Sequence, residues 1–150
     1  MSDHAFLKPA RSYAVMAFIS LAGLADAIFL TVEHLTGNAL SCVVSTGCSE
    51  VLASPYAMIG SIPIAVLGAA AYFLAFSAAT LGAFGHRWAG NFLLLLIGPM
   101  LGTTLWLLYV QAFVLHAFCD YCLLSAVFTF ALVGLIFAQR LRALPRGSAV

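Results

Sequence analysis

The chain has 150 residues, of which 64% are hydrophobic and only 7% are charged, and its formal net charge is +1. A soluble domain averages about 25% charged residues, so this composition excludes a soluble globular domain and predicts an integral membrane protein. The sequence has no basic patch with interleaved aromatic residues, which argues against nucleic-acid binding. The lipid bilayer is therefore the expected environment, and we expect an all-α fold of membrane-spanning helices.

The first apolar segment covers residues 13–32, and its only charged residue is Asp26. Its length suits a helix of about 20 residues that crosses a bilayer, and it exceeds the apolar region of about 7–15 residues in a signal peptide. We therefore predict a retained span. Because an acidic residue is costly in lipid, Asp26 is either a functional group, such as a proton relay, or a partner for a neighbouring helix.

The polar connection after this span carries Cys42 and Cys48. Its second half, residues 49–53, predicts a short helix lying at the membrane interface. A second span is predicted over residues 56–81, and the segment Gly60-Ser61-Ile62-Pro63 interrupts it early. A proline at that place suits either the first turn of a helix or a kink held by neighbouring helices.

The third and fourth spans are predicted over residues 91–115 and 119–138. Gly98 and Gly102 in the third span have the spacing that lets helices approach closely. The fourth span opens on a C-x-x-C motif. Together these segments predict a single membrane domain over residues 1–150, a four-transmembrane-helix bundle with an outer loop that carries a short interfacial helix.

The basic residues indicate how the bundle lies in the membrane. Four spans place all of them on the same side: Lys8, Arg11, Arg87, Arg140, Arg142 and Arg146. Basic residues are enriched on the cytoplasmic side of membranes. We therefore expect a multi-pass protein of the cell inner (plasma) membrane, with both termini cytoplasmic and all four cysteines on the periplasmic, extracytoplasmic side.

The C-x-x-C motif of Cys119 and Cys122 lies at a helix start, where backbone N–H groups and the helix dipole favour the thiolate of Cys119 and lower its pKa. Cys42 and Cys48 lie on the same side, where disulfides form and persist. Four cysteines allow three pairings. The pairing of nearest cysteines, Cys42 with Cys48 and Cys119 with Cys122, suits a relay by thiol–disulfide exchange. A Cys48–Cys119 link would be an intermediate of this relay. A lipid-soluble quinone suits the place of final acceptor.

Other interpretations of these residues stay open. Both cysteine pairs fit static structural disulfides in a non-enzymatic membrane scaffold. A zinc site would need all four thiolates to converge, and the spacing of Cys42 and Cys48 is unusual for one, so no metal is expected. His34 and His116 fall near the outer interface, either as haem or quinone ligands or as ordinary interfacial histidines.

These features resemble the bacterial homologues of vitamin K epoxide reductase over residues 24–137. The resemblance rests on four spans, a cysteine pair in the loop before the second span, the segment 48–57 running into Gly60-Ser61-Ile62-Pro63 and Gly68, and the C-x-x-C motif. It implies a quinone-dependent thiol oxidoreductase that reoxidises a thioredoxin-like or DsbA-like partner to support disulfide bond formation, with ubiquinone or menaquinone as the quinone. Many bacterial members carry a fused thioredoxin-like domain; this sequence ends at Val150, so a separate partner protein is expected.

The resemblance also implies roles for individual residues. Cys42 would exchange with the partner, Cys48 would attack or be linked to Cys119, and Cys122 would face the quinone. Ser54 would orient the quinone, because a hydroxyl donor there stabilises negative charge on a quinone oxygen; the alternative is a helix cap. A vitamin K quinone or epoxide reductase of the same fold is the alternative enzymatic function.

Overall fold

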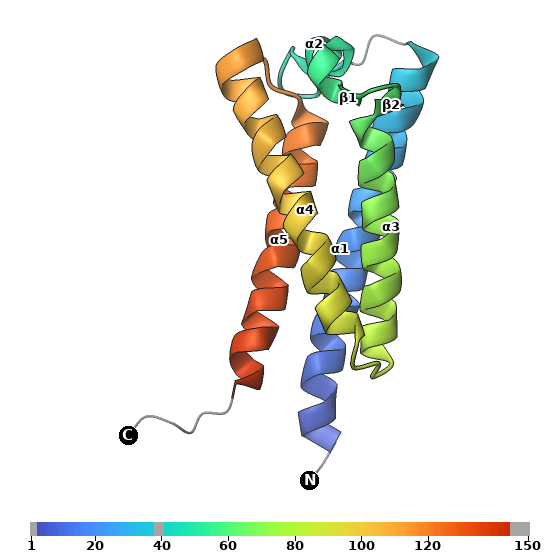
Figure 1. Ribbon diagram of the computed structural model, residues 1–150, viewed down its shortest axis with the longest axis vertical. Coiled ribbons are helices and arrows are strands. Elements are labelled where there is room, and N and C mark those ends of the chain that lie inside the picture. The colour runs from blue at the N-terminus through green and yellow to red at the C-terminus, as the bar shows by residue number, and fades with distance from the viewer. Residues whose placement is uncertain (1–2, 38–40, 145–150) are drawn as a thin grey trace.

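The computed structural model describes residues 3–37 and 41–144 of the chain. Four long helices run side by side (Figure 1): α1 (Asp3–Thr36), α3 (Ile64–Ala83), α4 (Ala89–Tyr109), which continues into the π-helix η2 (Val110–Leu115), and α5 (Asp120–Ala143). The connection between α1 and α3 contains the short helix α2 (Cys48–Ala53) and the 3₁₀ turn η1 (Pro55–Ala57). The predicted four-helix bundle with a short helix in the loop between its first two long helices is therefore confirmed.

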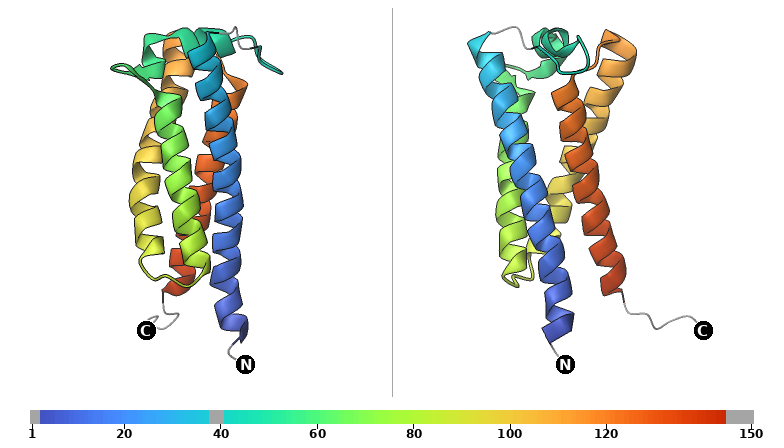
Figure 2. Two further views of the ribbon diagram at one scale, coloured as in Figure 1. Left: turned by 90° about the vertical axis from the view of Figure 1, so that its right-hand side faces the viewer. Right: turned by 180° about the vertical axis from the view of Figure 1, so that it is seen from behind.

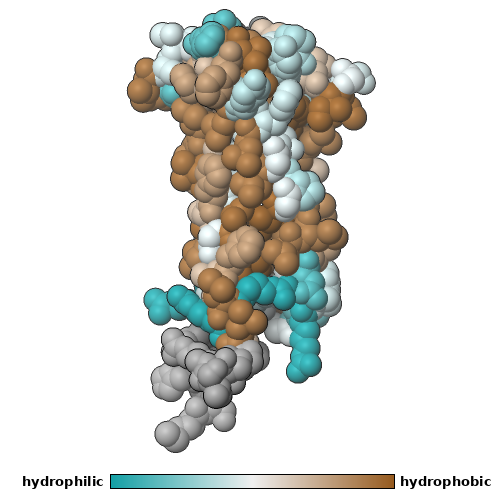
Figure 3. All heavy atoms as spheres, turned by 60° about the vertical axis from the view of Figure 1, so that its left-hand side comes forward, coloured by the Kyte–Doolittle hydropathy of each residue, from teal (hydrophilic) through white to brown (hydrophobic). Residues whose placement is uncertain are grey.

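Each long helix contains a segment that is long and apolar enough to cross a membrane: Ala10–Thr36, Ile64–Ala83, Ala89–Leu115 and Asp120–Ala143. The most apolar windows of these segments have mean hydropathies between 1.9 and 2.3, and a bilayer needs about 20 residues of helix. Figure 3 shows a broad hydrophobic band along the helices, with hydrophilic residues near the termini and also at the opposite end. Length, composition and surface thus agree with a multi-pass membrane protein.

The second long helix begins at Ile64, later than the predicted start at residue 56. Strands β1 (Met58–Ile59) and β2 (Ile62–Pro63) form an antiparallel hairpin before it. The tight turn depends on Gly60, whose φ of 64° lies in the left-handed region that two-residue hairpin turns use. Pro63 is extended, with ψ 136°, and its missing N–H removes no helical hydrogen bond. The proline therefore marks the start of the helix and not a kink within it.

The main buried apolar core lies mostly in the half of the bundle away from the cysteine-bearing loop, and Figure 2 shows the course of the helices there from two further sides. Helix α1 packs along α3 and also contacts α5, while α4 contacts both α3 and α5. Buried apolar residues fill this half of the bundle: Met16, Tyr72, Ala75, Ala78, Ala79, Leu93, Ile97, Leu132 and Ile136. The ends of α1 and α5 that lie in this half carry Arg11 and Arg140, and Arg87 lies in the α3–α4 connection at the same end.

The close helix approach expected at Gly98 and Gly102 is not made within the described chain, because a Cβ at either position would meet nothing within 4 Å. The close contact lies instead between α1 and α3. Gly23 packs directly against the ring of Tyr72, and a Cβ there would overlap the ring. Gly82 of α3 receives the ring of Tyr13 from α1 in the same way. Small residues thus join α1 to α3 and not α4 to a neighbour.

Candidate functional site

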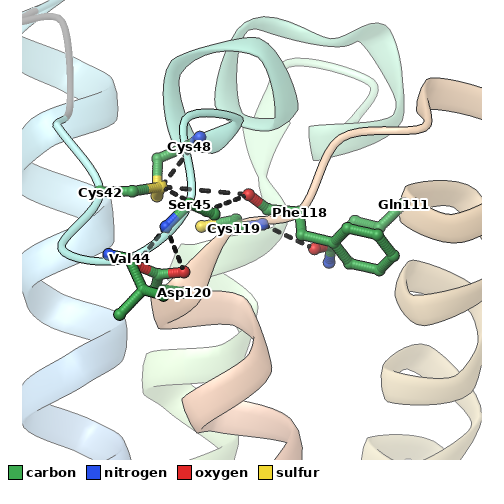
Figure 4. Close-up of a disulfide and its surroundings, with 8 residues drawn as sticks. All are labelled: Cys42, Val44, Ser45, Cys48, Gln111, Phe118, Cys119 and Asp120. Atoms are coloured by element: carbon green, nitrogen blue, oxygen red, sulfur yellow. Dashed lines mark hydrogen bonds between the residues drawn. A yellow bond between two sulfur atoms is a disulfide. The ribbon is translucent and has the colours of Figure 1, made fainter.

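All four cysteines gather at one end of the bundle, where the loop before α2, the end of η2 and the start of α5 meet. Figure 4 shows Cys42, Cys48 and Cys119 in this region. Cys48 and Cys119 belong to one buried cluster, against which Cys42 and Cys122 pack. These residues come from two segments more than 70 positions apart in the chain, and hydrogen bonds from Val44 and Ser45 to residues 118–120 hold the segments together. The fold therefore brings the two cysteine pairs together.

The two pairs differ in redox state. Cys42 and Cys48 form a disulfide, whereas Cys119 and Cys122 are free thiols. The pairs also differ in access: Cys48 and Cys119 are fully buried, while Cys42 and Cys122 are each partly exposed. The partly exposed sulfur of the loop disulfide is thus Cys42, and its buried sulfur lies toward Cys119.

The loop is held against the start of α5 by hydrogen bonds. The Asp120 carboxylate accepts from the backbone N–H of Val44 at 2.6 Å and of Ser45 at 3.2 Å. The Ser45 hydroxyl donates to the Phe118 carbonyl at 2.6 Å. Hydrogen bonds to an ionised acceptor are stronger than neutral ones, and negative charge is favourable in the first turn of a helix. Asp120, the second residue of the C-x-x-C motif, therefore fastens one cysteine pair to the other.

Gly47 lets the loop backbone lie directly on the segment before Cys119. Its φ of −93° and ψ of 1° are open to other residues, so conformation does not require glycine there. The lack of space does require glycine, because a Cβ at Gly47 would lie 2.8 Å from both the backbone N and the backbone O of Phe118. Backbone atoms cannot rotate away as a side chain can. The contact between the two segments therefore depends on the absence of a side chain.

Cys119 is the N-cap residue of α5, as the sequence predicts. The pKa of Cys119 is lowered, foremost because the Cys122 thiol donates a hydrogen bond to its sulfur, and further by the N–H groups of Cys122 and Tyr121; burial acts in the opposite direction. The direction agrees with the thiolate expected at a helix start. Cys119 is thus the inner cysteine whose ionised form the surroundings favour.

The lowered pKa predicts a pH dependence that can be measured in a variant with Cys42 and Cys48 both replaced by serine. The thiolate absorbance of the remaining pair should rise with pH, with a first midpoint below the value of about 8.5 for an ordinary thiol. Below that midpoint Cys119 is protonated and unreactive; above it the thiolate is present. Adding Cys122→Ala removes the donor and should move the midpoint upward. An unchanged midpoint would show that Cys122 does not stabilise the Cys119 thiolate.

A cavity of about 350 Å³ opens beneath the cysteines, between the four helices. Its walls are mostly apolar, and its polar lining includes Ser54, Tyr72, Gln111, Cys122, Ser125 and Thr129. Cys122 borders the cavity, whereas Cys119 does not. Tyr72 donates its hydroxyl proton to the Ser125 carbonyl at 2.8 Å, with Thr129 Oγ1 at 3.0 Å. The inner thiol pair therefore reaches the cavity through Cys122.

Ser54 caps the C-terminal end of α2 and also lies in the cavity wall. The helix-cap interpretation is confirmed, and a role toward a quinone stays a prediction. Ser54 is 8% exposed, and its hydroxyl donates to the Val51 carbonyl at 2.7 Å, at the end of α2. The oxygen keeps lone pairs for a second hydrogen bond, and the hydroxyl hydrogen can rotate. Ser54 can therefore offer a hydrogen-bonding group to a molecule in the cavity.

The remaining polar candidates lie in different surroundings. His34 borders the cavity, whereas His116 is exposed and ends η2 with a left-handed φ of 51°. Asp26 is buried, and its Oδ2 has no hydrogen-bond partner among the described residues. The alternative in which Asp26 pairs with a neighbouring helix therefore has no hydrogen bond to support it within residues 3–37 and 41–144. Over those residues no group of three or more His, Cys, Asp or Glu side chains could hold a metal ion.

Gln111 is a site residue that the sequence analysis misses. It lies in η2, is 1% exposed, borders the cavity and accepts the Cys119 N–H with its Oε1 at 3.0 Å. A signal exists in the sequence, since an uncharged polar residue within a long apolar span is unusual. Its hydrogen bond to Cys119 depends on the π-helical turn of η2, and the pattern of apolar residues in the sequence does not predict that turn. The residue therefore becomes recognisable only in the folded chain.

This arrangement defines a class: small four-helix membrane proteins that carry two cysteine pairs, one stacked on the other, at the mouth of an apolar cavity. The family model described as the vitamin K epoxide reductase family matches residues 14–137, and the chain belongs to this family. Membership implies a quinone-linked thiol oxidoreductase with a thiol redox partner. No curated protein matched the chain in the comparison.

Proposed function

We propose that the protein oxidises a thioredoxin-like or DsbA-like thiol protein on the extracytoplasmic side of the membrane and passes the electrons to ubiquinone or menaquinone, so that disulfide formation in other proteins can continue. The observation that carries this proposal is the order of the two pairs: an oxidised pair at the surface lies over a reduced pair at the cavity wall. Electrons would pass from Cys42 and Cys48 to Cys119 and Cys122.

The exposure of the cysteines supports a direction for the first exchange. A thiolate of the partner attacks the partly exposed sulfur of Cys42, and Cys48 leaves as a thiolate. The second partner thiol then attacks the mixed disulfide, so that the partner gains a disulfide and the loop pair gains two electrons and two protons. Cys48 is fully buried, which protects it from direct attack from outside.

The second exchange joins the two pairs. When Cys119 and Cys122 are joined as a disulfide, the Cys48 thiolate attacks Cys119 and releases Cys122 as a thiolate. Cys42 then attacks Cys48, which restores the loop disulfide and leaves the inner pair reduced. The structure has the redox state that this step leaves behind, and the shared buried cluster of Cys48 and Cys119 supports the link between them.

The cavity suits the ring of a quinone. Its volume of about 350 Å³ falls in the range of about 300–1,000 Å³ for small-molecule sites, which are mostly apolar with a few placed polar groups. A bound quinone would supply an acceptor for two electrons and two protons. A DsbA-like partner has a potential near about −120 mV, so the final acceptor must be more oxidising than most dithiols. Cys122 and Ser54 would face this acceptor.

The orientation of the chain is part of the proposal. The basic residues Arg11, Arg87 and Arg140 lie at one end of the bundle and the cysteines at the other. The positive-inside rule then supports an inner (plasma) membrane location in which the cysteine end faces the periplasm. Disulfide chemistry is favoured in that compartment and disfavoured in the cytoplasm.

The test is a quinone-reduction assay with purified protein, a reduced thioredoxin-like protein, and soluble analogues of ubiquinone and menaquinone. The ultraviolet signal of oxidised quinone should fall in step with oxidation of the partner, and the loss should require the cysteines. Cysteines that stay unchanged when quinone is added, with no partner oxidised, would indicate a scaffold. Turnover of vitamin K epoxide without partner oxidation would indicate the alternative enzyme.

A further inference from the structure

Only the oxygen of the Gln111 side-chain amide has a hydrogen-bond partner among the described residues. Its Oε1 accepts the backbone N–H of Cys119 at 3.0 Å, and its Nε2 is buried without a hydrogen-bond partner among the described residues. The two ends of an amide are often hard to tell apart, but a backbone N–H can only donate, so the oxygen must face Cys119. The nitrogen, with its two hydrogens, therefore points elsewhere.

The residue that carries the unpartnered nitrogen borders the cavity. Ser20, Asp26 and Gln111 each have a buried side-chain atom without a partner within the described chain, and of these three residues only Gln111 borders the cavity. Neighbouring hydroxyls of the lining are already paired: Ser54 with Val51, and Tyr72 with Ser125. A molecule in the cavity thus lies beside a residue whose side-chain N–H group has no acceptor among the described residues.

Leaving such a group unpaired is costly. A buried donor without an acceptor costs about 1–3 kcal/mol, and π-helical segments, which are rare, occur frequently at functional sites. Gln111 lies in the π-helix η2, whose end at His116 is in the left-handed region. An acceptor that enters the cavity would remove the cost. The mostly apolar walls select a molecule that is apolar except for a carbonyl oxygen.

We propose that Nε2 of Gln111 donates a hydrogen bond to one carbonyl oxygen of the quinone and holds the ring beside Cys122. This assignment rests on the proposed function. When the thiols of Cys119 and Cys122 form their disulfide, the two electrons and two protons they lose are taken up by the quinone, which becomes the quinol. The N–H of Gln111 stabilises the negative charge that develops on that oxygen.

The same side chain would then connect the quinone to the dithiol. Its oxygen holds the N–H of Cys119, the first residue of the motif, while its nitrogen holds the ring of the substrate. A single amide would therefore set the distance between the electron donor and the acceptor. Positioning of this kind contributes strongly to rate, since a displacement of about 1 Å can cost about 100-fold.

The test compares wild-type protein with Gln111→Leu and Gln111→Glu, using menadione labelled with carbon-13 at its carbonyls. Infrared spectra of the bound quinone should show one carbonyl band shifted to lower frequency in the wild type and returned toward the unbonded position in Gln111→Leu. We expect the dissociation constant and the KM for menadione to rise about 10-fold to 100-fold, as the loss of one buried hydrogen bond implies. Gln111→Glu keeps an oxygen for the Cys119 N–H, and its ionised form should also lose the shifted band.

Controls separate this assignment from a loss of folding and from a failure of the proposed function. Exchange of the Cys42–Cys48 disulfide with dithiothreitol should be the same in all three proteins, because Cys42 lies on the outer loop. If wild-type protein reduces quinone but its bound carbonyl bands match those of Gln111→Leu, the role of Gln111 is wrong and the proposed function stands. If wild-type protein neither binds nor reduces quinone, the proposed function itself fails.

Discussion

Replacing Cys122 with serine is expected to abolish quinone reduction, with a loss on the order of 10³-fold or more, the scale seen when a covalent catalytic group is removed. Cys122 is the inner cysteine that borders the cavity, and a disulfide cannot form with one sulfur. The measurement is the rate of quinone loss with reduced partner present. A variant that still reduces quinone at the normal rate, with the other cysteines intact, would contradict the relay.

The same variant should accumulate a specific cross-link. Cys119 remains in the buried cluster with Cys48, so its thiolate can attack Cys48, form a Cys48–Cys119 bond and release Cys42 as a thiolate. Because Cys42 can reverse this step, alkylation of the released Cys42 thiol traps the cross-link. Mass spectrometry without reductant would detect the linked peptides. Cys42→Ser is the matched control: it should lose partner oxidation, while its pre-reduced inner pair still reduces one equivalent of quinone.

Replacing Gly47 with alanine is expected to uncouple the two cysteine pairs. The new Cβ would lie 2.8 Å from the Phe118 backbone, so the loop must move away from the start of α5. Because a displacement of about 1 Å can cost about 100-fold in rate, we expect partner-dependent turnover to fall by about that factor. Quinone reduction by the pre-reduced inner pair should keep its normal rate, since that pair lies on α5.

Gly134→Ala provides the matched control for Gly47→Ala, because a Cβ at Gly134 would meet nothing within 4 Å. That variant should keep wild-type rates in both assays. Equal slowing of both reactions in Gly47→Ala would indicate general damage to the fold and not a loss of contact between the pairs. No slowing in either reaction would show that the loop tolerates the displacement.

The bundle could be predicted because the signals for membrane helices are strong and local. Runs of apolar residues over 20 positions or more have few other structures available in a membrane, and the basic residues Arg11, Arg87 and Arg140 fall at one end of the folded bundle. The predicted start of the second span, at residue 56, lies before the start of the helix at Ile64 because the apolar signal does not mark helix boundaries. Residues 56–63 carry no charged residue and run directly into the apolar helix, and the hairpin turn at Gly60 separates the two.

The two cysteine pairs could be predicted from the sequence, but the contacts around them could not. The proximity of the cysteines to a helix start and to each other follows from spacing and topology. The contacts that join the pairs, from Asp120 to the loop and from Gly47 to Phe118, link positions about 75 residues apart. No periodic pattern reports such contacts. The role of Gln111 could not be predicted, because only its hydrogen bond with the Cys119 N–H in the folded chain relates it to the cysteines.

The placement of the cysteines and the cavity in one half of the bundle has an energetic consequence. Close-packed apolar residues such as Leu93, Leu132 and Ile136 fill the other half. In the proposed relay the electrons and protons therefore both start and finish on one side, and no net charge crosses the membrane. Moving one elementary charge across 100 mV is worth about 2.3 kcal/mol. Turnover would be electroneutral: it neither draws on the membrane voltage nor works against it, and it should proceed equally well in de-energised vesicles.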